Sequence, residues 1–257
     1  MFKKILVILG LVLVCAIFSG YFYLTGSYAA AQSNKQRCDN IDVIITNPQQ
    51  QNFISESEVA DMVRKSVIGK QTEEINAFAL EQRLCASSAI CKAEAYVSGP
   101  TTLTLEVTQR HPVVRFMTPG GGFYCDSSGY ILPLLGKVSL DLPVVSGRML
   151  FDVPASRSGY PARGRDWLSD MLRLTETIRT NSYWGREIEQ IWVEDNTDVV
   201  IYTRSGNEKF ILGSPRDAAA KLEKMAGYYR TIKPAAKKEG KTYTTVNLKY
   251  KDQIICK

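Results

Sequence analysis

The chain has 257 residues, 45% of them hydrophobic, and a formal net charge of +6 at pH 7. Its basic residues occur throughout the sequence, so the modest positive charge argues against a nucleic-acid-binding protein. The six cysteines form no Cys-x-x-Cys pair and His111 is the only histidine, which argues against a zinc site or a thioredoxin-like centre. We therefore expect no metal and no cofactor. Cys85 and Cys91 are close enough in sequence to form a disulfide, and buried free thiols are the equal alternative.

Residues 5–24 form an uncharged, apolar run that follows Lys3 and Lys4. As a helix this run is about 30 Å long, which matches the hydrocarbon core of a bilayer. The preceding lysines place residues 1–4 in the cytoplasm and the rest of the chain outside it. A signal peptide cleaved after the alanines at 29–31 is the alternative, but the run is longer than a signal core. We predict a single-pass anchor at 5–24 and a tether at 25–37.

The next stretch predicts a small domain at residues 38–108. A β-branched strand at 41–45 precedes Ser55, which opens a capping box with Glu58 and starts a helix over about 56–66. A second helix is expected at about 75–84. Apolar and polar residues alternate in the last strand, as in a sheet with one solvated face. With strands at 92–98 and 101–108, the pattern predicts three strands with two helices on one face.

The remainder, residues 109–257, predicts a second domain with a mainly antiparallel sheet. Short strands are expected at 113–117, 122–126, 130–132, 188–193, 199–202, 209–212, 244–250 and 253–256. One helix is predicted at about 166–179. Another begins at Ser214-Pro215 and runs to about 231. Residues 147–164 are expected to be rich in loops. The basic segment 233–241 is expected to be a solvated loop, and an anion site is the alternative. The fold class is therefore α+β, with an N-terminal transmembrane helix and two folded domains.

The sequence offers little support for catalysis. His111 is the only imidazole, and it precedes a proline at a strand junction. The glycines at 120–122 precede a strand rather than a helix, so they lack the helix N-terminus that binds phosphate. Asp126 is an isolated acid, and Arg110 and Arg115 are expected to be solvated charges on a strand. We predict that the protein is not an enzyme, and a periplasmic cell-wall enzyme that uses His111 is the alternative.

The C-terminus is more informative. Residues 244–250 alternate between polar and apolar, and Val246, Leu248 and Tyr250 share one face of the predicted strand. A strand at a sheet edge has unpaired N–H and C=O groups that accept a strand from a partner. We identify Val246, Leu248 and Tyr250 as candidate partner-binding residues. The alternative is an ordinary internal strand covered by the last helix.

Several short motifs, in order, resemble those of the FtsQ/DivIB family of bitopic bacterial division proteins. Residues 42–107 resemble the POTRA domain of that family. Further matches are Leu80-Glu81-Gln82-Arg83-Leu84, Arg110-His111-Pro112-Val113, Tyr124 to Pro133, Leu142-Pro143-Val144-Val145-Ser146-Gly147 and Val246-Asn247-Leu248-Lys249-Tyr250. The family's Pro-Trp pair is absent, since Ser87-Ser88-Ala89-Ile90 stands in its place.

This resemblance implies a POTRA domain at 38–108 and a β domain at 109–257. It implies a non-enzymatic scaffold in the inner membrane at the division septum, with most of the chain in the periplasm. The partners would be bitopic proteins of the FtsB/FtsL type, bound through Val246, Leu248 and Tyr250 and linked to the septal wall synthases. A transport or assembly factor with a POTRA domain, released by cleavage after residue 31, is the alternative.

Overall fold

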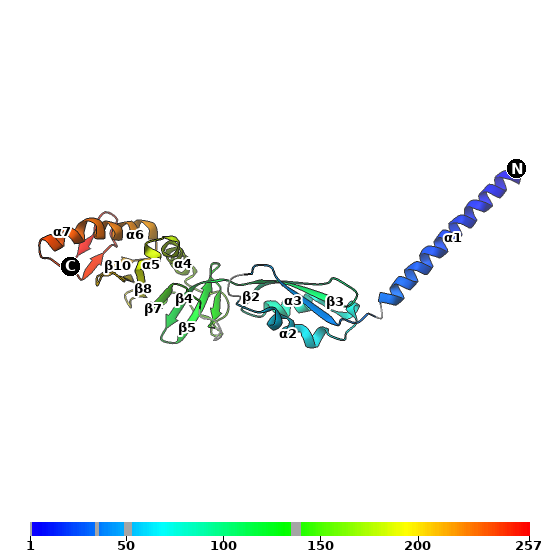
Figure 1. The fold of residues 1–257 in the computed structure, drawn as a ribbon, viewed down its shortest axis with the longest axis horizontal. Helices are drawn as coiled ribbons and strands as arrows, with labels where there is room; N and C mark the ends of the chain where they lie inside the picture. The colour runs from blue at the N-terminus through cyan, green and yellow to red at the C-terminus, as the bar shows by residue number, and fades with distance from the viewer. Residues whose placement is uncertain (1, 34–35, 49–52, 135–139) are drawn as a thin grey trace. The chain divides into compact units, whose positions relative to one another are not determined.

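The computed structural model describes residues 2–33, 36–48, 53–134 and 140–257. The chain divides into two compact units, Met1–Gln109 and Arg110–Lys257 (Figure 1). The two units are described separately below.

The chain begins with one long helix, α1 (Phe2–Ser33). Over the described part of the chain, no helix combines the length and the apolar character that a membrane crossing requires. The span predicted at residues 5–24 includes residues 5–9 and 11, whose side chains lie outside the described set. It stays a prediction from the sequence. Most of the tether predicted at 25–37 is helical, because α1 continues to Ser33.

A three-stranded sheet with two helices forms the rest of the first unit. Its elements are β1 (Asn40–Ile45), α2 (Glu56–Val67), a short 3-10 turn (Thr72–Glu74), α3 (Ala77–Cys85), β2 (Ile90–Val97) and β3 (Thr102–Gln109). The strand order is β1-β3-β2, with β1 parallel and β2 antiparallel to β3. This arrangement confirms the predicted unit of three strands and two helices.

The capping box predicted for α2 is present. The Ser55 hydroxyl accepts the Glu58 N–H at 3.3 Å, and the Glu58 carboxylate accepts the Ser55 N–H at 3.0 Å. Such a box satisfies N–H groups that the first helical turn leaves without partners. The alternation predicted for the last strand holds on its apolar face, since Leu103, Leu105 and Val107 are fully buried, but Thr104 on the predicted solvated face is also buried, at 3% exposure.

The second unit is built on a nine-stranded mixed sheet of order β12-β11-β10-β9-β8-β7-β4-β5-β6. The strands are β4 (Pro112–Thr118), β5 (Gly121–Asp126), β6 (Ile131–Pro133), β7 (Val144–Gly147), β8 (Ile188–Val193), β9 (Val199–Thr203), β10 (Lys209–Gly213), β11 (Thr245–Asn247) and β12 (Ile255–Cys256). The helices are α4 (Arg165–Thr180), α5 (Trp184–Glu187), α6 (Ala218–Gly227), a π-helix (Tyr228–Ile232) and α7 (Lys233–Lys238). Three neighbouring pairs, β10-β11, β7-β8 and β4-β7, are parallel.

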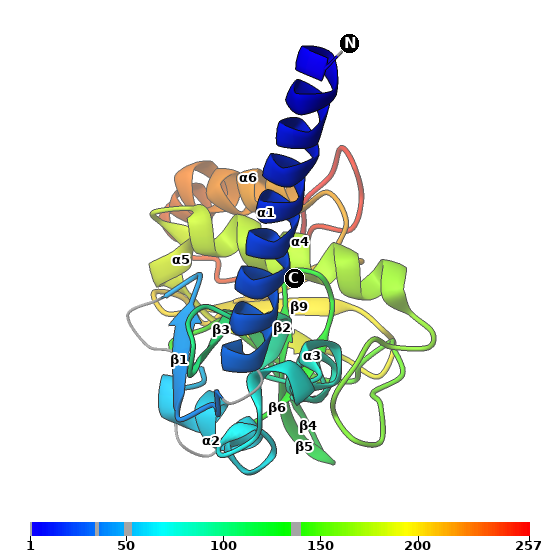
Figure 2. The same ribbon diagram turned by 90° about the vertical axis from the view of Figure 1, so that its right-hand side faces the viewer.

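Helices α4 and α6 lie on the same face of this sheet (Figures 1 and 2). The core between the sheet and these two helices combines inward side chains of the strands with the apolar sides of the helices. Its members include Phe116, Val145, Ile201, Phe210 and Val246 from the sheet, and Met171, Leu174, Leu222 and Met225 from α4 and α6. The last strands of the chain thus belong to the same core as the first strands of this unit.

Strand β7 is missing from the sequence-based prediction. It has four residues, and it lies between two parallel neighbours, β4 and β8. A strand of four residues is too short to show the alternation of apolar and polar residues by which strands are predicted. Its last residue, Gly147, has a φ of +97°, and a Cβ there would overlap the carbonyl oxygen of Val193. Only glycine allows the two backbones to approach so closely.

Two predictions for the helical segments after β10 are wrong, namely the start of α6 and the assignment of residues 233–241 to a loop. Helix α6 begins at Ala218 rather than at Ser214-Pro215, because Asp217 takes a left-handed conformation with a φ of +56°. The basic segment predicted as a solvated loop is largely helical, as α7 covers Lys233–Lys238. The Lys233 ammonium lies 2.8 Å from the Glu208 carboxylate, which fixes the start of this helix to the sheet.

The six cysteines are all free, so Cys85 and Cys91 are not joined. Cys38 and Cys125 are the buried thiols, whereas Cys85 and Cys91 are exposed. Burial raises the pKa of the Cys125 thiol, and the nearby Asp126 charge raises it further. Such a thiol is inert packing material rather than a nucleophile.

Candidate partner-binding edge

The structure separates the three candidate residues that the sequence placed on one strand face. Val246 and Leu248 are fully buried, whereas the Tyr250 side chain is 52% exposed. Strand β11 is not the outermost strand of the sheet, because it pairs with β10 on one side and β12 on the other. The side chains of Val246 and Leu248 therefore hold β11 on the core, and Tyr250 alone offers a surface.

Strand β11 ends sooner than predicted because of its last residue. The Asn247 side-chain oxygen accepts the Lys249 N–H at 3.0 Å, which starts a turn. The last ladder bond runs from the Leu248 N–H to the Ile211 carbonyl, at 2.8 Å. The Lys224 ammonium also donates to the Tyr250 carbonyl, which ties the turn to helix α6. Tyr250 thus lies in the turn between β11 and β12.

The outer edge of the sheet is strand β12. Thr245 and Lys257 exchange N–H···O bonds of 3.1 and 2.9 Å, so they form a hydrogen-bonded pair. In an antiparallel ladder such pairs alternate with non-bonded ones. The neighbouring pair of Val246 and Cys256 is therefore non-bonded, and the Cys256 N–H and C=O point away from β11.

A buried polar cluster fixes the helical segment that precedes β11 to the sheet. The Glu208 side chain is 6% exposed, and its carboxylate accepts the Tyr228 hydroxyl at 3.0 Å and the Lys233 ammonium at 2.8 Å. Burial alone would raise the pKa of Glu208, but the hydrogen bonds from Lys233, its own backbone and Tyr228 outweigh it and lower that pKa. Burial, together with the bond to Glu208, raises the pKa of Tyr228. The cluster is thus a charged carboxylate with a neutral phenol.

The π-helix presents consecutive tyrosines to the sheet. The Tyr229 hydroxyl lies 2.7 Å from the Thr203 hydroxyl, and its ring lies 4.8 Å from the Lys233 ammonium. A π-helical turn is a rare local departure from the α-helix, often conserved at functional positions. Here it allows both Tyr228 and Tyr229 to reach polar partners on β9 and beside β10. The segment that leads into β11 is therefore fixed on the sheet.

Two other sheet edges, β6 and β2, have outward backbone groups that are bonded to other segments. At β6, Ile131 exchanges backbone bonds of 2.9 and 3.1 Å with Gly159 of the long loop. At β2, the Glu81 carboxylate of α3 accepts the Ala95 N–H at 2.9 Å. Within the described residues, no side chain or loop bonds to the outward groups of Cys256. An uncovered edge is a template for a further strand.

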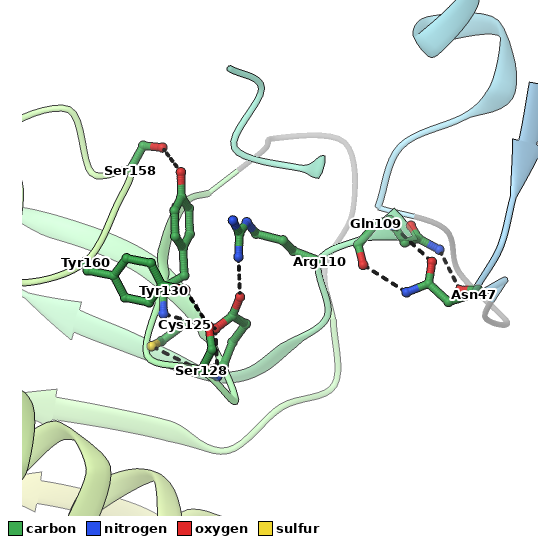
Figure 3. A network of polar contacts seen from close by, with 9 residues as sticks. Asn47, Gln109, Arg110, Cys125, Ser128, Tyr130, Ser158 and Tyr160 are labelled. Carbon is green, nitrogen blue, oxygen red and sulfur yellow. Dashed lines mark hydrogen bonds and ion pairs between the residues drawn. The ribbon is translucent and has the colours of Figure 1, made fainter. Parts of the chain in front are cut away.

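The acid and arginine near His111 serve a structural purpose (Figure 3). Arg110 is not a solvated charge as predicted, because it pairs with Asp126 at 3.0 Å and both side chains are about nine-tenths buried. The other Asp126 oxygen accepts the N–H groups of Ser128 and Tyr130 at 2.9 and 3.0 Å. The Arg110 guanidinium also lies 3.5 Å from the Tyr130 ring centre. Asp126 thus fixes the turn between β5 and β6.

The glycines at 120–122 lie at the tip of the hairpin between β4 and β5, and the long loop after β7 holds this tip in place. Arg157 of the long loop donates to the carbonyl oxygens of Gly120 and Gly122. Arg157 has a φ of +52°. The tip therefore anchors the loop, and it does not bind a phosphate in the manner of a glycine-rich helix start.

Comparisons with known proteins agree with this architecture. Residues 111–257 match the family model described as FtsQ/DivIB, C-terminal related, and residues 36–108 match the POTRA-like domain model. A relative is the cell division protein FtsQ of Geotalea daltonii, 26% identical over 160 residues. That alignment covers 62% of this chain and 54% of the relative, so the match spans about half the relative's length.

Proposed function

Because the chain belongs to the FtsQ/DivIB, C-terminal related family, we propose that it is a non-enzymatic scaffold of the bacterial division complex that captures bitopic partners of the FtsB/FtsL type by strand addition at β12. The family implies a cell division scaffold. The partners, the link to septal wall synthases and the binding edge are parts of this proposal.

The observation that carries the proposal is the outward-facing backbone of β12. Val246 and Leu248 hold β11 in a fixed register, and β11 holds β12. The Cys256 N–H and C=O then present a formed donor and acceptor to an arriving strand. Main-chain bonds supply the affinity in this mode of recognition, and side-chain pockets supply the specificity.

Two exposed apolar side chains flank this edge. Tyr250 is 52% exposed, and Ile255 is 37% exposed on the face that carries Asn247. Aromatic side chains are enriched among the residues that dominate binding energy. Tyr250 and Ile255 are therefore the proposed side-chain contacts, and Val246 and Leu248 act through the core.

The proposed scaffold is held at the membrane by residues 5–24. In support, this run has no charged residue. Apolar side chains of α1 such as Val12, Ile17 and Phe22 are 63%, 62% and 70% exposed. Extraction of membranes with alkaline carbonate tests this part, since an anchored chain stays in the pellet and a cleaved one appears in the supernatant.

Co-purification with an FtsB/FtsL-type partner tests strand addition. Cys256→Pro removes the outward N–H, and proline is tolerated at a strand edge where that N–H faces solvent. We expect this variant to lose the partner, while Cys256→Ala, which keeps the N–H, retains it. Equal recovery with both variants would rule out the edge. Deletion of residues 244–257 is a poorer test because it removes Val246 and Leu248 from the core.

Depletion of the protein in cells tests the broader role. A division scaffold predicts filaments without septa when the protein is depleted. Normal septation would contradict a function in division whatever the edge binds.

A further inference from the structure

The net charge of the second unit is concentrated at its C-terminal end. Residues 110–223 hold equal numbers of basic and acidic residues. Residues 224–257 hold nine basic residues and only two acids, Glu239 and Asp252, a net charge of +7. This stretch contains α7, β11 and β12. The positive excess of the whole unit therefore surrounds the edge described above.

Some of these basic groups are already neutralised inside the molecule. Lys233 pairs with Glu208, and Lys249 pairs with Asp198 at 3.0 Å. Lys241 pairs with Glu239, but both side chains are more than 60% exposed, so this bond adds little. Over the described part of the chain, Lys237 and Lys238 have no carboxylate partner. They are the free positive charges of α7.

Backbone hydrogen bonds link the last turn of α7, which carries these free charges, to one end of β12. A short segment, residues 239–243, joins the end of α7 to Thr244, and the Lys241 N–H donates to the Ala236 carbonyl at 2.9 Å. The Thr244 N–H in turn donates to the Lys257 carbonyl at 2.7 Å. A short segment and two backbone hydrogen bonds thus connect the last turn of α7 to the C-terminal end of β12. At the other end of the strand the basic groups have partners: Lys251 is next to Asp252 in the sequence, Lys249 pairs with Asp198, and the Lys224 ammonium donates to the Tyr250 carbonyl.

From this asymmetry we infer that the edge selects an extended peptide segment with carboxylates at the end that lies beside Lys237 and Lys238, and with apolar residues that meet Ile255 and Tyr250. This inference rests on the proposed function, because it names the chemistry of the strand that β12 captures. The backbone of Cys256 supplies the bonds common to any strand. The two lysines favour an acidic strand over a neutral or basic one.

An anionic lipid surface is the competing source of negative charge. A headgroup needs no outward N–H and no apolar contact, whereas the lysines here accompany both. The peptide segment accounts for all three features.

The test compares two synthetic peptides of about ten residues. Both alternate valine and threonine, and they carry either three glutamates or three glutamines at one end. Binding is measured by fluorescence anisotropy to the full chain in nanodiscs of uncharged lipid. We expect the glutamate peptide to bind about 3- to 10-fold more tightly at low ionic strength, since each exposed charge pair contributes modestly. The preference disappears near 1 M salt, where the screening length is about 3 Å.

Three variants make the result decisive. Lys237→Gln with Lys238→Gln abolishes the preference for glutamate but leaves the glutamine peptide unaffected. The matched double variant Lys65→Gln with Lys70→Gln, which removes two exposed charges from the first unit, keeps the preference. Cys256→Pro abolishes the binding of both peptides.

The outcomes separate this inference from the function on which it rests. Equal binding of the two peptides, lost in Cys256→Pro, overturns the charge selection and leaves strand addition intact. Binding that is unchanged in Cys256→Pro overturns both, as does no binding of either peptide. Vesicles containing phosphatidylglycerol are the last arm. Capture of vesicles that depends on Lys237 and Lys238, without a peptide preference, assigns the lysines to lipid and overturns the inference.

Discussion

The buried carboxylate of Glu208 gives a quantitative prediction for the support beneath the edge. Glu208→Gln keeps a side-chain oxygen for the Tyr228 hydroxyl but loses the ion pair with Lys233. A hydrogen bond to a charged group contributes about 1.5–3 kcal/mol. Lys233 is 38% exposed and regains water when its partner is neutral, which reduces the loss. We expect a loss of about 1–2 kcal/mol in the free energy of unfolding at pH 7.

The same substitution has a defined pH dependence. The pKa of Glu208 is lowered in the folded protein, so its carboxylate stabilises the fold above the unfolded pKa of about 4.3. That stabilisation is lost as the pH falls through the lower folded pKa. The difference between the wild type and Glu208→Gln is therefore full at neutral pH and shrinks below about pH 4.

Urea unfolding followed by tryptophan fluorescence measures this difference. All three tryptophans, Trp167, Trp184 and Trp192, belong to the second unit, so the signal reports that unit alone. Glu223→Gln is the matched control, because that glutamate is 71% exposed and pairs with an exposed arginine. It should shift stability by less than about 0.5 kcal/mol. Two outcomes would refute the buried ion pair. One is equal stability of Glu208→Gln and Glu223→Gln at pH 7, and the other is a difference between the wild type and Glu208→Gln that persists at low pH.

Four further substitutions test other parts of the structure. Gly147→Ala should destabilise the second unit by at least about 2 kcal/mol in the same urea assay, because of its positive φ and the overlap with Val193, and a loss under 1 kcal/mol would contradict that close approach. Leu248→Ala leaves a cavity in the core and should lower the free energy of unfolding by about 2–5 kcal/mol. Tyr250→Ala should change that free energy by less than about 1 kcal/mol but weaken partner binding. The reverse order of the two stability losses would show that the core and surface positions are wrongly assigned. Ser55→Ala should lower the stability of the first unit by about 0.5–2 kcal/mol, and the amides of helix α2 should then exchange faster. Unchanged amide exchange would argue against the capping box.

Regular, local patterns in the sequence predicted most of the first unit. The capping box at Ser55 and the alternation of Leu103 to Val107 each depend on residues close in the chain, and the structure has both. The second unit resisted prediction where tertiary contacts decide. Strand β7 exists because two long-range neighbours flank it. Helix α7 follows a π-turn and depends on long-range contacts, because Tyr228 of that turn and Lys233 of the helix both contact Glu208, which lies about 20 to 25 residues earlier.

The sequence singles out the C-terminal stretch as the candidate site, and the structure of that stretch differs from the expectation in its details. The alternation at residues 244–250 correctly put Val246 and Leu248 on one face. The structure has the alternative named for this strand, because β11 is internal and that face lies in the core. The sequence also predicts a strand at 253–256, and the structure has its last two residues as β12, but the sequence does not reveal that this strand pairs on the outer side of β11. The outward backbone of Cys256 is a property of ladder register, which depends on the pairing of Thr245 with Lys257.

The most direct test of the captured strand is amide exchange by NMR at single residues of β12, with and without the periplasmic segment of an FtsB/FtsL-type partner. In the free protein the Cys256 N–H should exchange freely, while the Lys257 N–H, bonded to Thr245, is protected. Adding the partner should protect Cys256 and leave Lys257 as it was. A Cys256 amide that still exchanges freely in the saturated complex would contradict strand addition at this edge.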